Sequence, residues 1–249
     1  MNLILIYICF SVLAVGYSIQ FVQGFWGYKK RTAIPPNDGK INRSLACGAT
    51  TAIDRAPPGQ TVKVSGRIKR HDKILKAPFS GRECVFYEVF VEERHDTLRD
   101  GHYWHCVVHD AASVDFLIED DTGLALIKKD KLKAALRAAA TKDYLWEEVG
   151  LLGQTSPDLE AFMVRHGQST KGLVFNKKLR YREGVFELDE EVIALGTAIW
   201  EHAPEGTTTR QGYRGAAQRL VLGPLPGGSI LMSDSLEVLE KMDESNELA

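Results

Sequence analysis

The chain has 249 residues, 26% of them charged, and a formal net charge of -2 at pH 7, whereas nucleic-acid-binding domains are more often basic. Its four cysteines form no C-x-x-C pair, which excludes a zinc ribbon or a RING built from these residues. One cysteine lies in the apolar N-terminal segment and the other three are scattered, so we expect no disulfide framework and a reducing compartment.

The N-terminal segment Leu3–Trp26 contains no charged residue. About 20 apolar residues span the core of a bilayer as a helix, so residues 3–26 are expected to contact lipid as a single transmembrane helix. Trp26 and Tyr28 are predicted to lie at the headgroup level, where amphipathic rings are favoured.

The basic cluster Lys29, Lys30 and Arg31 follows this segment directly. By the positive-inside rule the cluster stays in the cytoplasm, so the domain behind it is expected to face the cytoplasm. A cleaved signal peptide, the first alternative, would carry a positive charge before the apolar core and a small-x-small cleavage site, and neither is present. A buried helix of a soluble protein, the second alternative, would need apolar partners on every side.

Proline and glycine within residues 34–39 and 56–59 predict turns, with a short helix or turn over 41–51 between them. The expected division of the chain is an anchor (1–28), a juxtamembrane linker (29–59), one folded domain (60–242) and an acidic tail (243–249).

Alternating apolar and polar residues over Thr61–Arg70 predict a half-buried strand. Further strands are expected at 84–92, 103–108, 114–119, 124–127, 191–200 and 218–222, and helices at 131–141, 156–166 and from 234 to about 242. Strands, then helices, then strands again indicate an α+β class: a β-rich domain whose short strands could close a small barrel with flanking helices.

Four blocks of sequence, taken in order, resemble one known family. The blocks are residues 75–87, 116–123, 181–185 together with 192–197, and 229–236. They are similar to the GIDE domain, also called the "beside a membrane" domain, of a mitochondrial membrane-anchored RING E3 ubiquitin ligase and of many bacterial and plant proteins. The resemblance covers roughly residues 60 to 240.

The resemblance implies a function in binding rather than in catalysis. The family's ligases owe their activity to a C-terminal RING, and the cysteines of a RING are missing here. We therefore expect a single-pass, membrane-anchored binding module that recognises a protein, a peptide or a small ligand on the cytoplasmic side, in a prokaryotic inner membrane. The alternatives are an E3 ubiquitin-transferase-like protein whose partner supplies the RING, and a structural scaffold of a membrane complex.

The candidate binding residues lie in two turns and on two strands. The turns contain Pro78, Ser80 and Gly81 in one case and Asp121 and Gly123 in the other, and they either set strand register or line a ligand groove. Tyr87 and Trp104 either pack in the core or supply aromatic contacts to a ligand. We interpret Arg180, Arg182 and Glu183 as a surface ion pair on a strand.

His102, His105, Cys106 and His109 form the most metal-like cluster. On a helix all four would share one face. On a strand, His105 and His109 would share one face about 13 Å apart while the other two point away, so they could not hold one ion. Because the segment reads as a strand, we expect no metal and no cofactor.

Cys84 is the one candidate nucleophile, with His71 or His105 as its base. A cysteine beside valine and phenylalanine at the start of a strand usually packs as a small hydrophobe. We therefore predict no catalytic residue.

Overall fold

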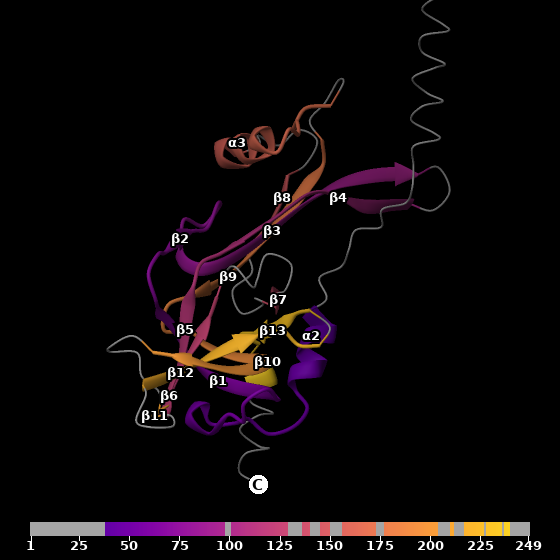
Figure 1. Cartoon of the computed structure of the whole chain (residues 1–249). Coiled ribbons are helices and arrows are strands. Elements are labelled where there is room, and N and C mark those ends of the chain that lie inside the picture. Colours follow the sequence, from indigo (N-terminus) through magenta and orange to yellow (C-terminus); the bar gives the residue numbers. More distant parts are fainter. Residues whose placement is uncertain are drawn as a thin grey trace, which may run out of the picture.

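The computed structural model describes residues 38–97, 101–128, 136–139, 145–149, 156–172, 177–203, 210–211, 217–226, 228–235 and 237–239 (Figure 1). The expected anchor, its interface residues from Trp26 to Arg31 and the acidic tail lie outside these ranges. Within them, no helix is both long and apolar enough to cross a bilayer.

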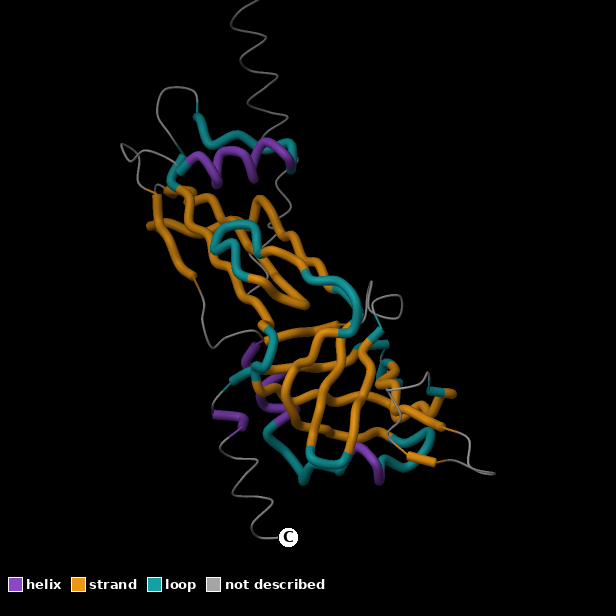
Figure 2. The backbone as a smooth tube through the Cα atoms, turned by 90° about the vertical axis from the view of Figure 1, so that its left-hand side faces the viewer, coloured by secondary structure: helices purple, strands orange, loops and turns teal. Residues whose placement is uncertain are grey.

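Two β-sheets form two bodies stacked along the long axis of the molecule (Figures 1 and 2). The helical elements are α2 (Asp38–Leu45), η1 (Ile53–Arg55) and α3 (Pro157–Arg165). The first sheet contains β1 (Thr61–Arg70), β5 (Phe116–Asp120), β6 (Gly123–Ile127), β7 (Leu136–Ala139), β10 (Glu191–His202), β11 (Arg210–Gln211), β12 (Ala217–Gly223) and β13 (Ile230–Ser233). The second contains β2 (Leu75–Lys76), β3 (Glu83–Thr97), β4 (Gly101–Ser113), β8 (Leu145–Val149) and β9 (Leu179–Glu187).

Five strands of the first sheet close into a barrel. Around the ring the order is β1, β5, β6, β12, β10 and back to β1, and only the β6–β12 pair is parallel. This is the connectivity of a Greek-key OB-type barrel. The interior is filled by alternate residues such as Val64, Phe116 and Leu220. The expected β-rich domain with a small barrel is therefore confirmed.

Gly66 of β1 lies where the strand changes its pairing from β10 to β5. Up to Arg67 the strand pairs with β10, and from Arg67 onward it pairs with β5. At Gly66, a Cβ atom would lie 2.2 Å from the carbonyl oxygen of Glu119. Any other residue would push β5 away, so Gly66 permits the close approach that closes the barrel.

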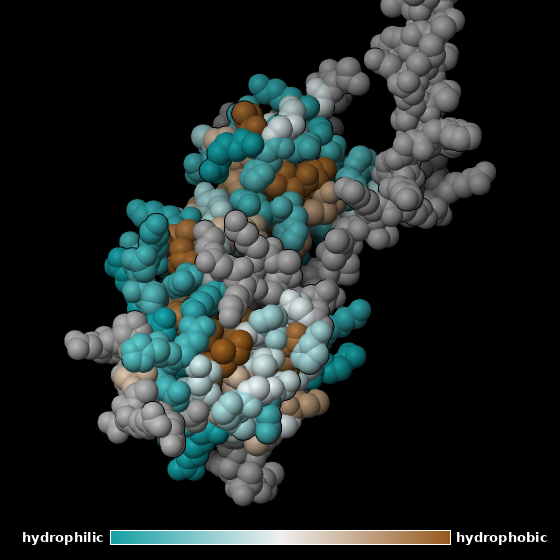
Figure 3. Space-filling view, in the orientation of Figure 1, coloured by the Kyte–Doolittle hydropathy of each residue, from teal (hydrophilic) through white to brown (hydrophobic). Residues whose placement is uncertain are grey.

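The second sheet is built from two insertions into the barrel. One, containing β2 to β4, lies between β1 and β5; the other, containing β7 to β9 and α3, lies between β6 and β10, although β7 itself joins the first sheet. α3 covers one face of the second sheet and lies at its outer end in Figure 2. In Figure 3 the apolar residues on the visible face form separate patches among hydrophilic ones.

α2 packs on the outside of the barrel. Ile41 and Leu45 are buried against Ile193 of β10 and against Val238 and Leu239 near the C-terminal end. The range 29–59, expected to be a linker, therefore includes a helix that belongs to the folded body from residue 38 onward.

The helix expected over residues 131–141 is wrong for residues 136–139, which form a strand. They form β7, which pairs in parallel with β13 from Leu136 opposite Ile230 to Ala139 opposite Ser233. Alanine and leucine favour a helix by less than a kilocalorie per mole each, and pairing with a sheet edge overrides that preference.

Candidate functional site

The two faces of the second sheet differ in chemistry. Along β3, odd-numbered residues such as Val89 and Val91 pack under α3, while even-numbered residues such as Phe90 and Glu92 lie on the opposite face. We call the opposite face, with Glu88, Phe90, Glu92, Trp104, Cys106, His109, Arg180 and Arg182, the ladder face.

A bulge in β4 changes which of the metal-like residues lie together. Val91 pairs with Val108 but Glu92 pairs with Cys106, so Val107 is an extra residue. Beyond the bulge the alternation is reversed, which places His105, opposite Glu93, on the α3 face.

The expected arrangement of His105 and His109 on one face is therefore wrong. His109 shares the ladder face with Cys106 and with His102, which pairs with Asp96. Among the residues that the structure describes, no three His, Cys, Asp or Glu side chains are placed to hold a metal ion.

Two guanidinium groups stack on aromatic rings of the ladder face. Arg180 lies over the Trp104 ring, 4.2 Å from its centroid, and Arg182 lies 4.1 Å from the centroid of Phe90. His109 stacks on Phe90, with 4.2 Å between centroids and 8° between planes. Both guanidinium carbons therefore lie over a ring face at a distance typical of a cation–π interaction.

Two carboxylates contact the cationic and imidazole side chains of the ladder face. Arg180 Nε donates to Glu92 Oε2 at 2.6 Å, and His109 Nε2 lies 2.9 Å from Glu88 Oε1. Arg182 is only 7% exposed, which corrects the expectation that Arg182 and Glu183 form a surface pair. The ladder face is a preorganised row of arginine, aromatic and carboxylate groups.

Cys106 lies within this row but has no features of a nucleophile. Its thiol donates to the carbonyl oxygen of Val108 at 3.3 Å. Burial, together with the nearby carboxylate of Glu92, raises the pKa of the thiol.

The loop with Pro78, Ser80 and Gly81 is attached to the other face. Glu183 of β9 is fully buried, and its carboxylate accepts the backbone N–H groups of Phe79 at 2.7 Å and Ser80 at 2.9 Å. Gly81 has φ of +66°, which favours glycine at this turn. The loop therefore closes over a buried carboxylate.

Tyr87 lies on the same side as this loop. Its hydroxyl donates to Asp110 Oδ2 at 3.3 Å, and His166 Nε2 lies 3.5 Å from the same oxygen. Trp104 is on the opposite face, so the structure brings Tyr87 to the Pro78–Gly81 loop but does not bring Trp104 to either.

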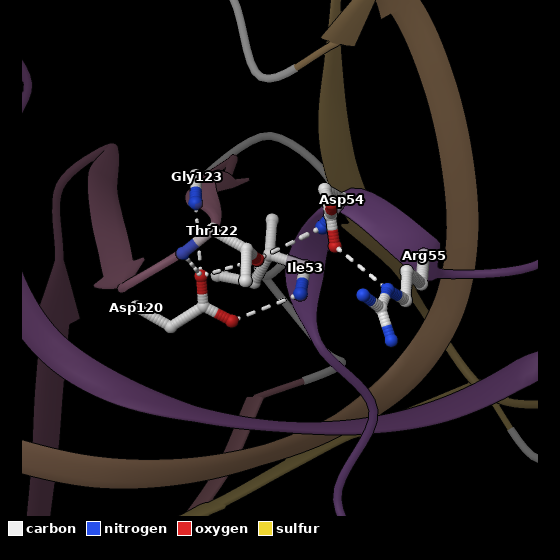
Figure 4. Close-up of polar contacts among 6 residues, drawn as sticks. All are labelled: Ile53, Asp54, Arg55, Asp120, Thr122 and Gly123. Carbon is white, nitrogen blue, oxygen red and sulfur yellow. Dashed lines mark hydrogen bonds and ion pairs between the residues drawn. The ribbon is translucent and has the colours of Figure 1, made fainter.

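Asp121 and Gly123 lie at the β5–β6 turn, which belongs to the first sheet. Figure 4 shows the polar contacts between this turn and η1. The residue that organises this turn is Asp120, which the sequence did not single out. Its Oδ1 accepts from the backbone N–H groups of Thr122 and Gly123, and its Oδ2 accepts from Ile53 N at 2.9 Å. Asp121 is exposed.

Cys84 is buried in a small cluster with Ala77 and Val185. Desolvation, followed by the carboxylates of Glu183 and Glu187, raises the pKa of its thiol from 9.0 to about 12. A thiol in this environment stays protonated at neutral pH and is a poor nucleophile.

Comparisons of this chain with family models, with curated proteins and with solved structures find no match.

Proposed function

We propose that the chain is a binding module held beside a membrane, and that it recognises a protein partner through the ladder face. The observation that carries this proposal is Arg180, which lies over the partly exposed ring of Trp104 and keeps 29% of its own side chain exposed. Tryptophan and arginine dominate the energetic centres of protein interfaces, because they combine a large apolar surface with directed donors.

Two features of the sequence support the membrane part of the proposal. The uncharged segment Leu3–Trp26 has the length of a bilayer span, and Lys29–Arg31 follow it. The resemblance of the blocks in residues 75–87 and 181–185 to the GIDE domain also suggests a domain that acts next to a bilayer.

Photo-crosslinking in the native membrane tests the docking face. A photo-reactive amino acid is placed at Ala111, an exposed position on the ladder face opposite Glu88, in the full chain. The matched control is the same amino acid at Val164, which is 66% exposed on the α3 side. We expect a discrete crosslinked protein from Ala111 and none of the same mass from Val164.

Variants of the ladder face complete the test. Trp104→Leu and Arg180→Gln, each combined with the crosslinker at Ala111, are expected to lower the yield of that product about tenfold or more. Equal products from both crosslinking positions, or a product unaffected by both substitutions, would refute the proposal.

A further inference from the structure

β4 lies at an edge of the second sheet. Among the described strands it pairs with β3 alone, whereas β3 also pairs with β9 on its other side. The bulge at Val107 interrupts the strand, and the regular part that follows runs from Val108 to Ser113. A strand at the edge of a sheet presents backbone groups that can pair with another chain.

The register of the ladder shows which backbone groups of β4 point away from the sheet. Val114 N donates to Val85 O, so the odd-numbered residues of β3 are hydrogen-bonded to their partners in β4. In an antiparallel ladder these bonded pairs alternate with pairs that share no hydrogen bond. His109, Ala111 and Ser113 belong to the second kind, because they lie opposite even-numbered residues of β3. Their N–H and C=O groups therefore point outward.

This outward row is open in the part of the chain that the structure describes. The backbone groups of His109, Ala111 and Ser113 make no hydrogen bond there on the side away from β3. The side chains of His109 and Ala111 are exposed, and residues 109–113 include neither lysine nor proline. Lysine and proline are two of the means by which native edge strands avoid pairing with other chains. The edge can therefore accept another strand over five residues.

We propose that an extended segment of the protein partner pairs with β4 along residues 109–113 and continues the second sheet, as in β-strand addition. The inference rests on the proposed function and specifies how the partner of the ladder face is held. The edge and the ladder face are continuous, since the exposed side chains of His109 and Ala111 belong to both. A partner that covers the ladder face at this end therefore reaches the open backbone groups.

The edge also indicates what kind of segment fits it. Every second side chain of an added strand lies on the ladder face, about 5 Å from those of His109 and Ala111. Alanine leaves room beside it, so a large side chain of the segment can lie over Ala111 toward Glu88, the residue opposite Ala111 in β3. We expect a segment rich in β-branched and aromatic residues, which favour strands.

A second copy of this chain fits the edge less well. Two copies joined through β4 would place their ladder faces side by side and leave both uncovered. Five paired residues on each copy also bury far less than the ~1,200 Å² that a stable interface needs.

Proline substitution tests the edge, because proline removes the backbone N–H of the residue that it replaces. Ala111→Pro and Ser113→Pro each remove an outward donor that β3 does not use, and edge strands accept proline at such positions. The matched control, Ala111→Ser, keeps the donor. Each variant is made in the full chain with a photo-reactive amino acid at Asp96, an exposed ladder-face position outside the edge segment, and is crosslinked in the native membrane.

We expect both proline variants to lower the yield of the crosslinked partner about tenfold or more, and Ala111→Ser to keep it. A yield that neither proline variant changes, but that Trp104→Leu lowers, would overturn this inference and leave the proposed function standing. The absence of a product from both Asp96 and Ala111 would overturn the two together. A product with twice the mass of the chain would show a second copy at the edge, against the inference.

Hydrogen exchange of the wild-type chain in nanodiscs gives a test that does not depend on the folding of a variant. The amides of His109, Ala111 and Ser113 are expected to exchange at least about tenfold faster than those of Asp110 and Ala112, which are bonded to β3. Equal protection of the two sets would mean that the edge is already covered in the chain itself, and the inference would be wrong.

Discussion

Ser80 donates its backbone N–H to Glu183 Oε2 at 2.9 Å, across a large separation in the sequence. The neighbouring Phe79 N–H binds the other carboxylate oxygen at 2.7 Å, so both oxygens are used. This contact joins the loop within residues 75–87 to β9. The buried carboxylate of Glu183 thus accepts hydrogen bonds from two backbone donors of the loop.

Glu183→Gln is expected to lower the free energy of unfolding by about 2–3 kcal/mol. It removes the charge from two charge-assisted hydrogen bonds and turns an amide N–H₂ toward one backbone donor. Urea denaturation followed by intrinsic fluorescence measures the loss. Glu191→Gln, at an exposed position on β10, is the control and is expected to change the value by less than about 0.5 kcal/mol. Equal effects of the two substitutions would contradict the role of Glu183.

Lys63→Met tests the attachment of α2 to the barrel. Lys63 is 5% exposed, and its ammonium donates to the carbonyl oxygens of Leu45, Cys47 and Gly48 at the end of α2. Methionine keeps the apolar length but leaves these acceptors without a donor, so we expect a loss of about 1–3 kcal/mol. Limited proteolysis is expected to cut first near residues 38–48. The exposed control Lys76→Met is expected to keep the wild-type pattern.

Lys63 is also expected to make the free energy of unfolding depend on pH. Burial lowers the pKa of Lys63 from its ordinary value of 10.5. Between the lowered value and 10.5 the unfolded chain binds more protons, so Lys63 makes stability rise with pH in that window. Denaturation curves at several alkaline pH values are expected to show this contribution in the wild type and to lose it in Lys63→Met. Parallel curves for the two proteins would contradict it.

The first strand of the barrel could be predicted from sequence because apolar and polar residues alternate along it, although the structure also buries Lys63 between Val62 and Val64. Thr61–Arg70 alternates apolar and polar residues, and the structure places β1 there without a shift. A small barrel was expected, but the strands that close it could not be predicted, because closure depends on the parallel pairing of β6 with β12, which no local pattern encodes. β9 was harder to recognise because Arg182 and Glu183 are buried, while charged residues usually indicate a surface.

Several residues of the candidate site could be singled out from the sequence, but their arrangement in space could not be predicted. Trp104 was singled out, yet its partner Arg180 was interpreted as an exposed ion pair. The bulge at Val107 carries no sequence signal, and one extra residue reverses the face of every residue beyond it. Asp120 was missed because Asp121 and Gly123 beside it matched the same turn pattern.

Asp120→Ala is expected to destabilise the barrel by about 2–3 kcal/mol, because it leaves Ile53 N and the N–H groups of the β5–β6 turn without their acceptor. The adjacent Asp121→Ala is the control, since that side chain is exposed, and we expect a change below about 0.5 kcal/mol. Thermal unfolding followed by circular dichroism compares the two. A larger loss for Asp121 than for Asp120 would show that the turn is organised differently.

Cys84→Ala is expected to remove part of the alkaline instability of the protein. With a pKa of about 12 in the folded state against 9.0 as its ordinary value, the folded thiol keeps its proton between these pH values while the unfolded one loses it. The folded state then binds one more proton, so stability falls with pH by about 1.4 kcal/mol per unit. Urea denaturation between pH 8 and pH 10 is expected to give a shallower decline for Cys84→Ala than for the wild type.

Cys47→Ala is the matched control for this experiment, because it removes an exposed thiol. It is expected to change the free energy of unfolding at pH 7 by less than about 0.5 kcal/mol. In the native wild type, iodoacetamide is expected to alkylate Cys47 long before Cys84, as peptide mass mapping would show, since only a thiolate reacts and the Cys84 thiol is buried and protonated. Early alkylation of Cys84 would mean that its thiol is accessible and ionised, which would make it a candidate nucleophile after all.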